Sequence, residues 1–318
     1  MNEKKFAADI KVLLCFITVN LFSLAIWHNV YRKKDFIRHF IVKCEKLEFR
    51  FRSNLTSINT IIDSCLVLIA LIITVSASFC IFHINLAPLQ LKMYFSFFTF
   101  AKGQDTFSML IKGTVIIIQF VCLLIPPAIA ALLSGIVYFK TSDLLGKFRE
   151  NLKNVKMDVL YHNEISKLFT NYNFLYLLVH EVEEEFSITI FMLLCSQWLN
   201  MNTVLLAYIL YEGDLLSYSL GSLMIAQLIF AVILNVGVIL CASRISYQVF
   251  RVQTALQVMY NRVGTVKSSP LHIVKNMLDI KFPVMTACGV LKLNPSLIAT
   301  SFGSVLTYGL LVINVNRS

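Results

Sequence analysis

Long apolar stretches recur along the chain, with shorter and more polar segments between them. Six of these stretches are long enough to cross a bilayer, which takes roughly 20 apolar residues in a helix. They are Val12 to Val30, Ser64 to Ile84, Thr114 to Phe139, Phe186 to Tyr211, Leu215 to Ser243 and Leu293 to Val315. Strands of a membrane barrel would be about ten residues long, with apolar and polar residues alternating. The pattern predicts an all-α polytopic membrane bundle with six spans.

Composition and charge agree with this class and give the bundle an orientation. Hydrophobic residues make up 57% of the chain and charged residues 14%, whereas about a quarter of a soluble domain is charged. The net charge is +10, and 21 of the 28 Lys and Arg residues lie in alternate connectors, at 31–57, 140–185 and 244–292. Basic residues concentrate in cytoplasmic connectors. The basicity therefore reflects membrane topology, and we do not expect nucleic acid as a partner.

An even number of spans with these connectors inside places both termini outside the cell. Lys4, Lys5 and Lys11 favour the opposite side for the N-terminus. We therefore expect either a weakly oriented first span or a preceding span that this sequence lacks.

Several connectors repeat apolar residues at intervals of three and four, as helices do. The repeat runs from Leu145 to Phe186 and returns from Ile245 to Val263. We therefore expect helices that project into the cytoplasm. The predicted organisation is a transmembrane bundle at 1–242 with cytoplasmic helical extensions at 31–57 and 140–187, a cytoplasmic helical anchor region at 243–292, and a final helix at 293–318, with Asn294 and Pro295 starting it.

Residues that carry catalytic or metal chemistry are scattered along the chain. The eight cysteines and six histidines have no metal-ligand spacing, and no P-loop, glycine-rich dinucleotide turn, HExxH or nucleophile triad occurs. We expect no metal, no cofactor and no enzymatic activity. The run of acids at Glu181, Glu183, Glu184 and Glu185 is interpreted as a solvated helix face, and Pro126 with Pro127 as a kink in the third span.

The C-terminal residues carry a family resemblance. Thr286-Ala-Cys-Gly289 is followed by Leu293-Asn294 and then by Thr307-Tyr308, five further residues and Asn314-Val315. This order resembles the C-terminal signature of the insect gustatory receptors, in the arthropod gustatory and odorant chemoreceptor superfamily. The family motif is Thr-Tyr, five hydrophobic residues and Gln-Phe, so Asn314 and Val315 depart from it. The resemblance is specific from Phe282 to Asn316 and looser upstream.

The resemblance implies a seven-span receptor in which the six spans here match the second to the seventh. It further implies a tetrameric, ligand-gated, non-selective cation channel in the plasma membrane of chemosensory neurons, with an extracellular C-terminus and a small-molecule tastant as ligand. The last helix of each subunit would line the pore. By motif position, Leu311 and Val315 would form the gate, with Asn314, Tyr308 and Thr307 beside them.

The ligand pocket would lie in the outer half of the bundle. Depth and side-chain chemistry alone select six candidates, namely Phe79, Phe82, Gln119, Phe120, Gln227 and Phe230, and each of them is also a plausible core residue.

A G-protein-coupled receptor with seven spans and a small-molecule transporter are the alternative functions. Against the G-protein-coupled receptor, no DRY-like triplet follows any span and the last span lacks Asn-Pro-x-x-Tyr. Against the transporter, the two halves show no inverted repeat.

Overall fold

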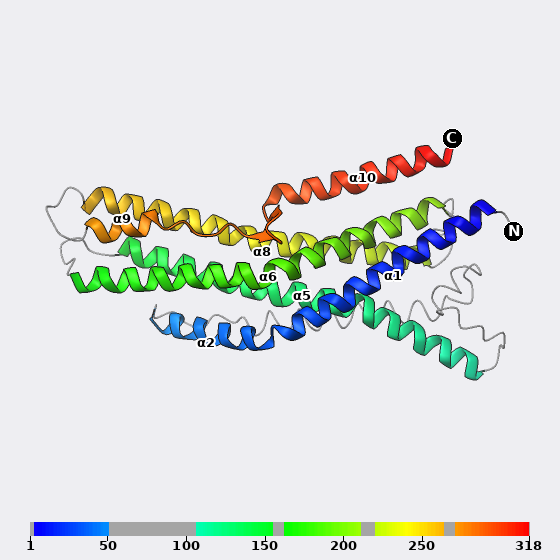
Figure 1. The fold of residues 1–318 in the computed structure, drawn as a ribbon, viewed down its shortest axis with the longest axis horizontal. Helices are drawn as coiled ribbons and strands as arrows, with labels where there is room; N and C mark the ends of the chain where they lie inside the picture. Colours follow the sequence, from blue (N-terminus) through cyan, green and yellow to red (C-terminus); the bar gives the residue numbers. More distant parts are fainter. Residues whose placement is uncertain (1–2, 51–105, 155–161, 211–219, 264–270, 318) are drawn as a thin grey trace.

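The computed structural model describes residues 3–50, 106–154, 162–210, 220–263 and 271–317. Almost all of these residues lie in long helices that run along one common direction (Figure 1). The helices are α1 (Glu3–Arg32), α2 (Lys34–Arg50), α5 (Thr106–Asn154), α6 (His162–Leu210), α8 (Leu220–Val263), α9 (Leu271–Asp279) and α10 (Pro295–Arg317). A hairpin of β1 (Thr286–Ala287) and β2 (Leu291–Lys292) separates α9 from α10.

The structure contains apolar helices that can cross a membrane. Among the described residues, three helices contain segments that are long and apolar enough to span a bilayer: Leu123–Asn154, Ile165–Leu206 and Gln227–Arg262. The shorter segment Pro295–Leu311 is also apolar. Five of the six predicted spans overlap α1, α5, α6, α8 and α10 over most of their length, and the span from Ser64 to Ile84 lies outside the described residues. The prediction of an all-α membrane bundle is confirmed.

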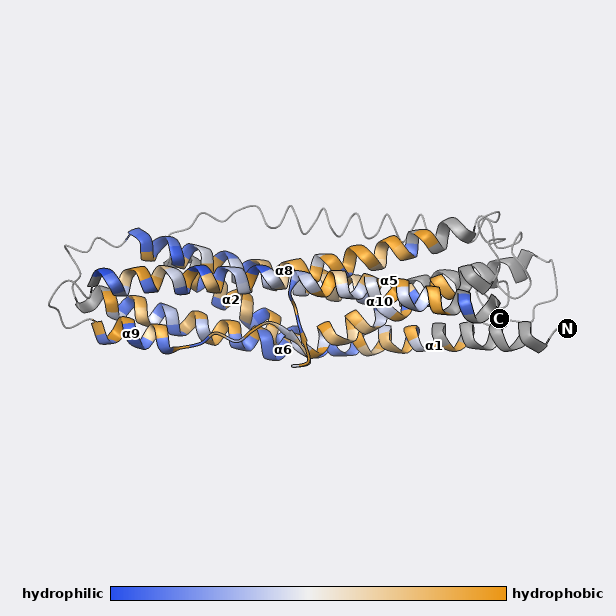
Figure 2. Cartoon of the chain, turned by 90° about the horizontal axis from the view of Figure 1, so that it is seen from above, coloured by the Kyte–Doolittle hydropathy of each residue, from blue (hydrophilic) through white to orange (hydrophobic). Residues whose placement is uncertain are grey.

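The bundle has two halves of different polarity (Figure 2). One contains α2 and α9 and mixes hydrophilic with hydrophobic residues; we call it the polar half. The other contains α10 and most of α1, and its coloured residues are mainly hydrophobic; we call it the apolar half. Helices α5, α6 and α8 run through both halves. The start of α1 and the end of α10 lie at the same end of the bundle (Figure 1).

The predicted helical repeats form the core of the polar half. Their apolar positions on α5 and α6 are buried, namely Phe148, Leu152, Ile165, Tyr172, Leu175, Val179, Val182 and Phe186. On α8, Ile245, Val252, Leu256 and Met259 are buried as well. Residues three or four apart lie on one helix face, so the repeat places these side chains between the helices. Pro126 and Pro127 lie within α5, which continues through them without a break.

Candidate pore helix and its anchor

Helix α10 begins at a cap that the sequence predicts. The backbone N–H of Leu297 donates to Oδ1 of Asn294 at 3.1 Å, and Oγ of Ser296 donates to the same oxygen at 2.7 Å. Pro295 occupies the first helical position, where its missing N–H leaves no bond unmade. An Asn side chain of this kind satisfies a backbone donor that the helix itself leaves free.

A tight hairpin leads into this cap. Thr286 pairs with Lys292 and Ala287 with Leu291, in antiparallel register. Between them the backbone of Cys288 and Gly289 has positive φ, at 56° and 68°, the pattern of a type I′ turn. Glycine adopts this conformation freely, whereas a side chain at Cys288 makes it strained. The chain therefore reverses sharply between α9 and α10, where the sequence indicated only a short link.

The hairpin is docked on α6 through three hydrogen bonds. The N–H of Cys288 donates to the carbonyl of Ser187 at 3.2 Å, and Oγ of Ser187 donates to the carbonyl of Thr286 at 3.2 Å. Oγ1 of Thr286 donates to Oε1 of Glu183 at 2.5 Å. Glu183 and Ser187 are one turn apart and so share one face of α6. The base of α10 is thereby tied to the middle of the bundle.

Two neighbouring carboxylates on α6, Glu181 and Glu185, bind lysines of α2 and of the α1–α2 junction. Glu181 accepts hydrogen bonds from Nζ of Lys43 at 2.7 and 2.6 Å, and Glu185 lies 3.6 Å from Nζ of Lys33. Glu181 and Glu185 are four residues apart and share a face, whereas Glu183 is rotated by roughly 160° from that face. Burial lowers the pKa of Lys33, and the nearby Glu185 partly opposes this.

These contacts correct the expectation of a solvated acidic face. That description fits Glu184, which is largely exposed and lies 3.8 Å from Nδ1 of His180. The three other carboxylates bind groups from the α1–α2 junction, α2 and the hairpin, all far away along the chain. Helical periodicity places the acids on two faces, but only the arrangement of the neighbouring segments decides that each face has partners, with Glu181 and Glu185 still partly exposed.

One face of α10 packs against the bundle. Leu297, Ser301 and Gly309 are buried and recur at multiples of four. A Cβ atom at Gly309 would lie 2.5 Å from Cδ2 of Leu205 on α6, closer than carbon atoms approach. Glycine therefore allows the close contact between α10 and α6.

A second face of α10 is polar and exposed. It contains Thr300, Ser304, Thr307, Leu311 and Asn314, all exposed in this chain. At 100° per residue these positions fall within roughly 80° of one another. We call them the polar stripe. Thr300, Ser304 and Thr307 each donate a hydroxyl hydrogen to the carbonyl four residues earlier, at 3.1, 2.9 and 2.8 Å. Leu311 is the one apolar member.

The third face of α10 is apolar and also exposed. Phe302, Leu306 and Leu310 lie there, centred about 120° around the helix from the polar stripe. Tyr308 is half-exposed and lies between the polar stripe and the packing face.

The structure brings part of the predicted site together. Thr307, Leu311 and Asn314 share the polar stripe, with Tyr308 at its border. The side chain of Val315 lies outside the described part of α10.

Less can be assigned for the predicted ligand pocket. Gln227 and Phe230 are buried on α8. Gln119 and Phe120 lie on α5, but the structure does not describe their side chains. Phe79 and Phe82 lie outside the described residues.

The sequence interpretation missed the roles of three residues at or near the contacts of α10 and its hairpin. They are Glu183, Gly309 and Asn235. Asn235 of α8 is buried beside a cavity of about 10 Å³, lined also by Met201, Ser301 and Phe302. Its amide O and N have no hydrogen-bond partner among the described residues. A polar residue within a predicted membrane span is a general signal of function. Asn235 lies within the predicted span Leu215 to Ser243, so the sequence carried this signal.

Within the described residues, no group of three His, Cys, Asp or Glu side chains is placed to hold a metal ion. The arrangement offers instead a capped apolar helix with one polar stripe, tied at its base to the bundle.

The chain matches neither a protein-family model nor a curated protein. Its fold is similar to the solved structure of the insect olfactory receptor OR5 from Machilis hrabei in complex with eugenol. The TM-score is 0.61 and the identity 14%, over 97% of this chain and 82% of that receptor chain. A second structure of the same receptor gives a TM-score of 0.59 at 14% identity, over 98% of this chain and 88% of that chain. This protein therefore has the fold of an insect olfactory receptor.

Proposed function

We propose that this protein is a gustatory-type chemoreceptor that acts as a ligand-gated, non-selective cation channel. The observation that carries the proposal is the polar stripe of α10, on a helix that is otherwise apolar. The shared fold with an insect olfactory receptor supports the same class of protein.

A polar stripe of this kind suits contact with water better than contact with lipid. The hydroxyls of Thr300, Ser304 and Thr307 already bond within the helix, but each oxygen keeps further bonding capacity that hydrocarbon leaves unused. The apolar face of Phe302, Leu306 and Leu310 suits lipid or another helix. Helix α10 thus has one side for the bundle, one for an apolar environment and one for a water-filled path.

A single α10 cannot enclose such a path, so several copies of the chain are required. We propose four identical or related subunits with their polar stripes around a central axis. Leu311, exposed on the stripe, then forms an apolar ring that closes the path by excluding water. Asn314 and Val315 lie next to it along the helix.

The ligand is a small organic molecule bound in the apolar half. OR5 from Machilis hrabei binds eugenol, and we propose a tastant of comparable size for this chain. Gln227 and Phe230 remain the described candidates for the pocket. We place the receptor in the plasma membrane of chemosensory neurons, with the polar half in the cytoplasm and the C-terminus outside. An epitope tag after Ser318 should then bind antibody on intact cells.

The gate is tested by replacing Leu311 with Ser. A hydroxyl in the ring weakens the exclusion of water, so resting cation conductance in a heterologous cell should rise several-fold. Whole-cell recording without ligand measures this, after surface labelling has shown equal expression.

Leu310→Ser is the matched control. Leu310 is 63% exposed and Leu311 58%, but Leu310 lies on the apolar face, 100° away. Its replacement should leave the resting conductance close to wild type. Equal conductance in the two variants, or no increase with Leu311→Ser at wild-type surface levels, would contradict the assignment of the pore face.

A further inference from the structure

A cleft between α5 and α8 lies in the polar half, away from α10. Its volume is about 480 Å³, within the range of small-molecule sites. Leu152, Ala255, Val258 and Met259 contribute apolar surface. Leu152 and Met259 are buried core residues, so the cleft has an apolar wall that continues into the core of the bundle.

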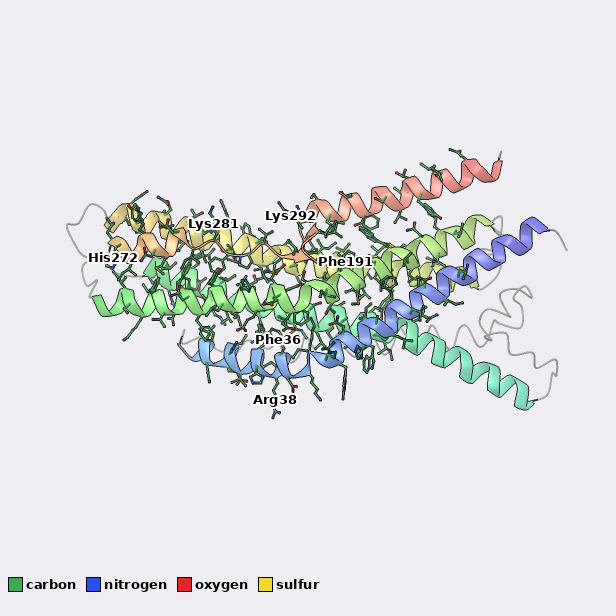
Figure 3. The ribbon with its side chains drawn as sticks, viewed as in Figure 1. Phe36, Arg38, Phe191, His272, Lys281 and Lys292 are labelled. Atoms are coloured by element: carbon green, nitrogen blue, oxygen red, sulfur yellow. The ribbon has the colours of Figure 1, made fainter. Side chains whose placement is uncertain are left out.

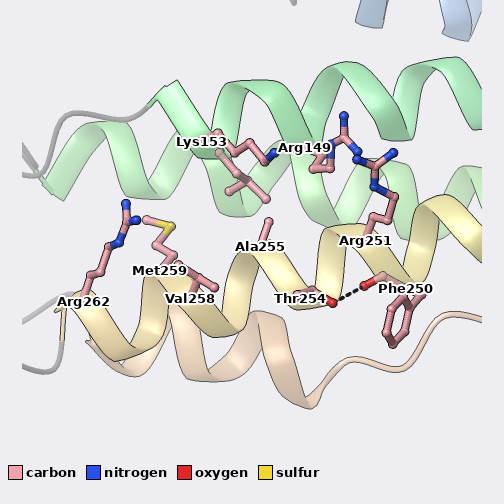
Figure 4. A pocket seen from close by; sticks show the side chains of 10 residues that line it. Arg149, Lys153, Phe250, Arg251, Thr254, Ala255, Val258, Met259 and Arg262 are labelled. Carbon is pink, nitrogen blue, oxygen red and sulfur yellow. Dashed lines mark hydrogen bonds between the residues drawn. The ribbon is translucent and has the colours of Figure 1, made fainter.

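The remaining walls of the cleft are strongly basic. Arg149 and Lys153 come from α5, and Arg251 and Arg262 come from α8. Figure 4 shows the guanidinium groups of Arg149 and Arg251 directed toward one another across the helix pair, with Lys153 on the same side. The described residues that line the cleft include no Asp or Glu. The positive charges that line the cleft repel one another, and an anion bound between them would replace this repulsion with attraction.

Arg149 has hydrogen-bonding capacity that its described surroundings leave unused. The side chain is only 13% exposed, and its Nη2 lies 3.8 Å from Oε1 of Glu150, on a largely exposed side chain. Nε and Nη1 are buried without a hydrogen-bond partner among the described residues. A buried guanidinium donor without an acceptor is unfavourable, and a phosphate oxygen is an acceptor that suits its planar geometry.

We propose that this cleft binds a phosphate-bearing polyanion, held between Arg149 and Arg251 with Lys153 and Arg262 at its edges. Four cations around one cleft match several phosphates better than a single one. The apolar wall accommodates the carbon skeleton of the ligand. A bound polyanion would bridge α5 and α8, two helices that pack against each other through the bundle.

The phosphates have two possible sources, a soluble polyphosphate or the headgroup of a phosphoinositide lipid. The experiment therefore has two arms, both with the purified full-length protein in nanodiscs. In the first, inositol hexakisphosphate is titrated into neutral-lipid nanodiscs and binding is measured by calorimetry. In the second, the nanodiscs contain phosphatidylinositol 4,5-bisphosphate, and the shift in thermal unfolding is measured against neutral lipid. Saturable calorimetric binding in the first arm, or a thermal stabilisation by the phosphoinositide in the second, supports the proposal and identifies the source.

Two pocket variants locate the binding. The double substitution Arg149→Gln with Arg251→Gln should weaken binding by about 10-fold or more, because it removes charge-assisted hydrogen bonds. Thr254→Glu should weaken it by a similar factor, since it adds a carboxylate at the exposed rim of the cleft while leaving the four cations in place. Thr254 has an exposed side chain, so this variant tests the site even where the double variant fails to fold.

The matched control is Arg38→Gln with Lys46→Gln, which removes the same charge from exposed positions on α2. Figure 3 shows Arg38 pointing away from the bundle. This control should bind as the wild type does. Binding that survives Thr254→Glu, or that the control weakens equally, would overturn the proposal. So would the lack of saturable binding up to about 1 mM in both arms. A change in subunit number in the double variant without any phosphate binding would identify the cleft as a contact between copies instead.

Discussion

In the polar half, α5, α6 and α8 pack so closely that Phe148, Tyr172 and Leu256 are fully buried. In the apolar half, α10 contacts α6 and α8 on one side and leaves Leu306 and Leu310 exposed. The long helices thus bury core residues in both halves, whereas α10 packs against them on one side alone.

The difference follows from what surrounds each half. Water drives apolar side chains of the polar half together, whereas lipid gives the apolar half no comparable force between helices. Close contacts such as Gly309 against Leu205 and polar contacts at the hairpin take over there.

The largest expected effect comes from opening the core of the polar half. Leu175 is fully buried, and Leu175→Ala should lower the free energy of unfolding by about 2–5 kcal/mol, because it removes buried surface and leaves a cavity. Leu177→Ala on the same helix is the control, since Leu177 is 57% exposed. Thermal unfolding in detergent measures both. Similar losses in the two variants would show that the polar half is not packed as described.

The next largest effect is expected from a substitution at the contact of α10 with α6. A leucine at Gly309 must displace Leu205, and overpacking of this kind costs about 1–3 kcal/mol. The matched control is Gly303→Leu, because no atom lies within 4 Å of a Cβ placed there. We expect lower thermal stability for Gly309→Leu alone, with partial recovery when Leu205 is also changed to Ala. A loss in Gly303→Leu as large as in Gly309→Leu would contradict the packing face of α10.

A smaller effect comes from the ion pair between α2 and α6. Lys43 and Glu181 are both more than a third exposed, so solvent screens their attraction. A double-mutant cycle with Lys43→Met and Glu181→Gln should give a coupling of about 0.2–1 kcal/mol. The coupling should fall at high salt. A coupling that is indistinguishable from zero at low salt would show that burial of α2 residues such as Phe40 holds this helix instead.

The smallest effect is a pH dependence at Lys33. Burial lowers its folded-state pKa below the ordinary value of 10.5. Between these two pKa values the unfolded chain binds more protons than the folded chain, so stability rises with pH there. Relative to Lys33→Met, the wild type should therefore gain thermal stability as the pH approaches 10.5 from below. If the difference in thermal stability between wild type and Lys33→Met stayed constant over this pH range, the burial of Lys33 would be contradicted.

Much of the architecture can be predicted from local patterns. Apolar intervals of three and four predicted the buried faces that contain Phe148, Tyr172 and Leu256, because a helix has the same period wherever it lies. Asn294 with Pro295 marked the start of α10, since a cap needs only neighbouring residues. Thr307 and Asn314, which the C-terminal motif singled out, share the polar stripe of α10.

The remaining features depend on helices that meet across long stretches of sequence. Glu183 and Thr286 are 103 residues apart, and Lys43 and Glu181 are 138 apart. No local pattern tells which of two acidic faces a distant helix will cover.

The sequence alone therefore determined the helices, their apolar faces and the start of α10, because each depends on residues within one or two turns. The tertiary structure decided that Gly309 meets Leu205, that Glu183 holds the hairpin, and that cations of α5 and α8 converge in one cleft. These depend on which helices become neighbours, and that is settled by the packing of the whole bundle.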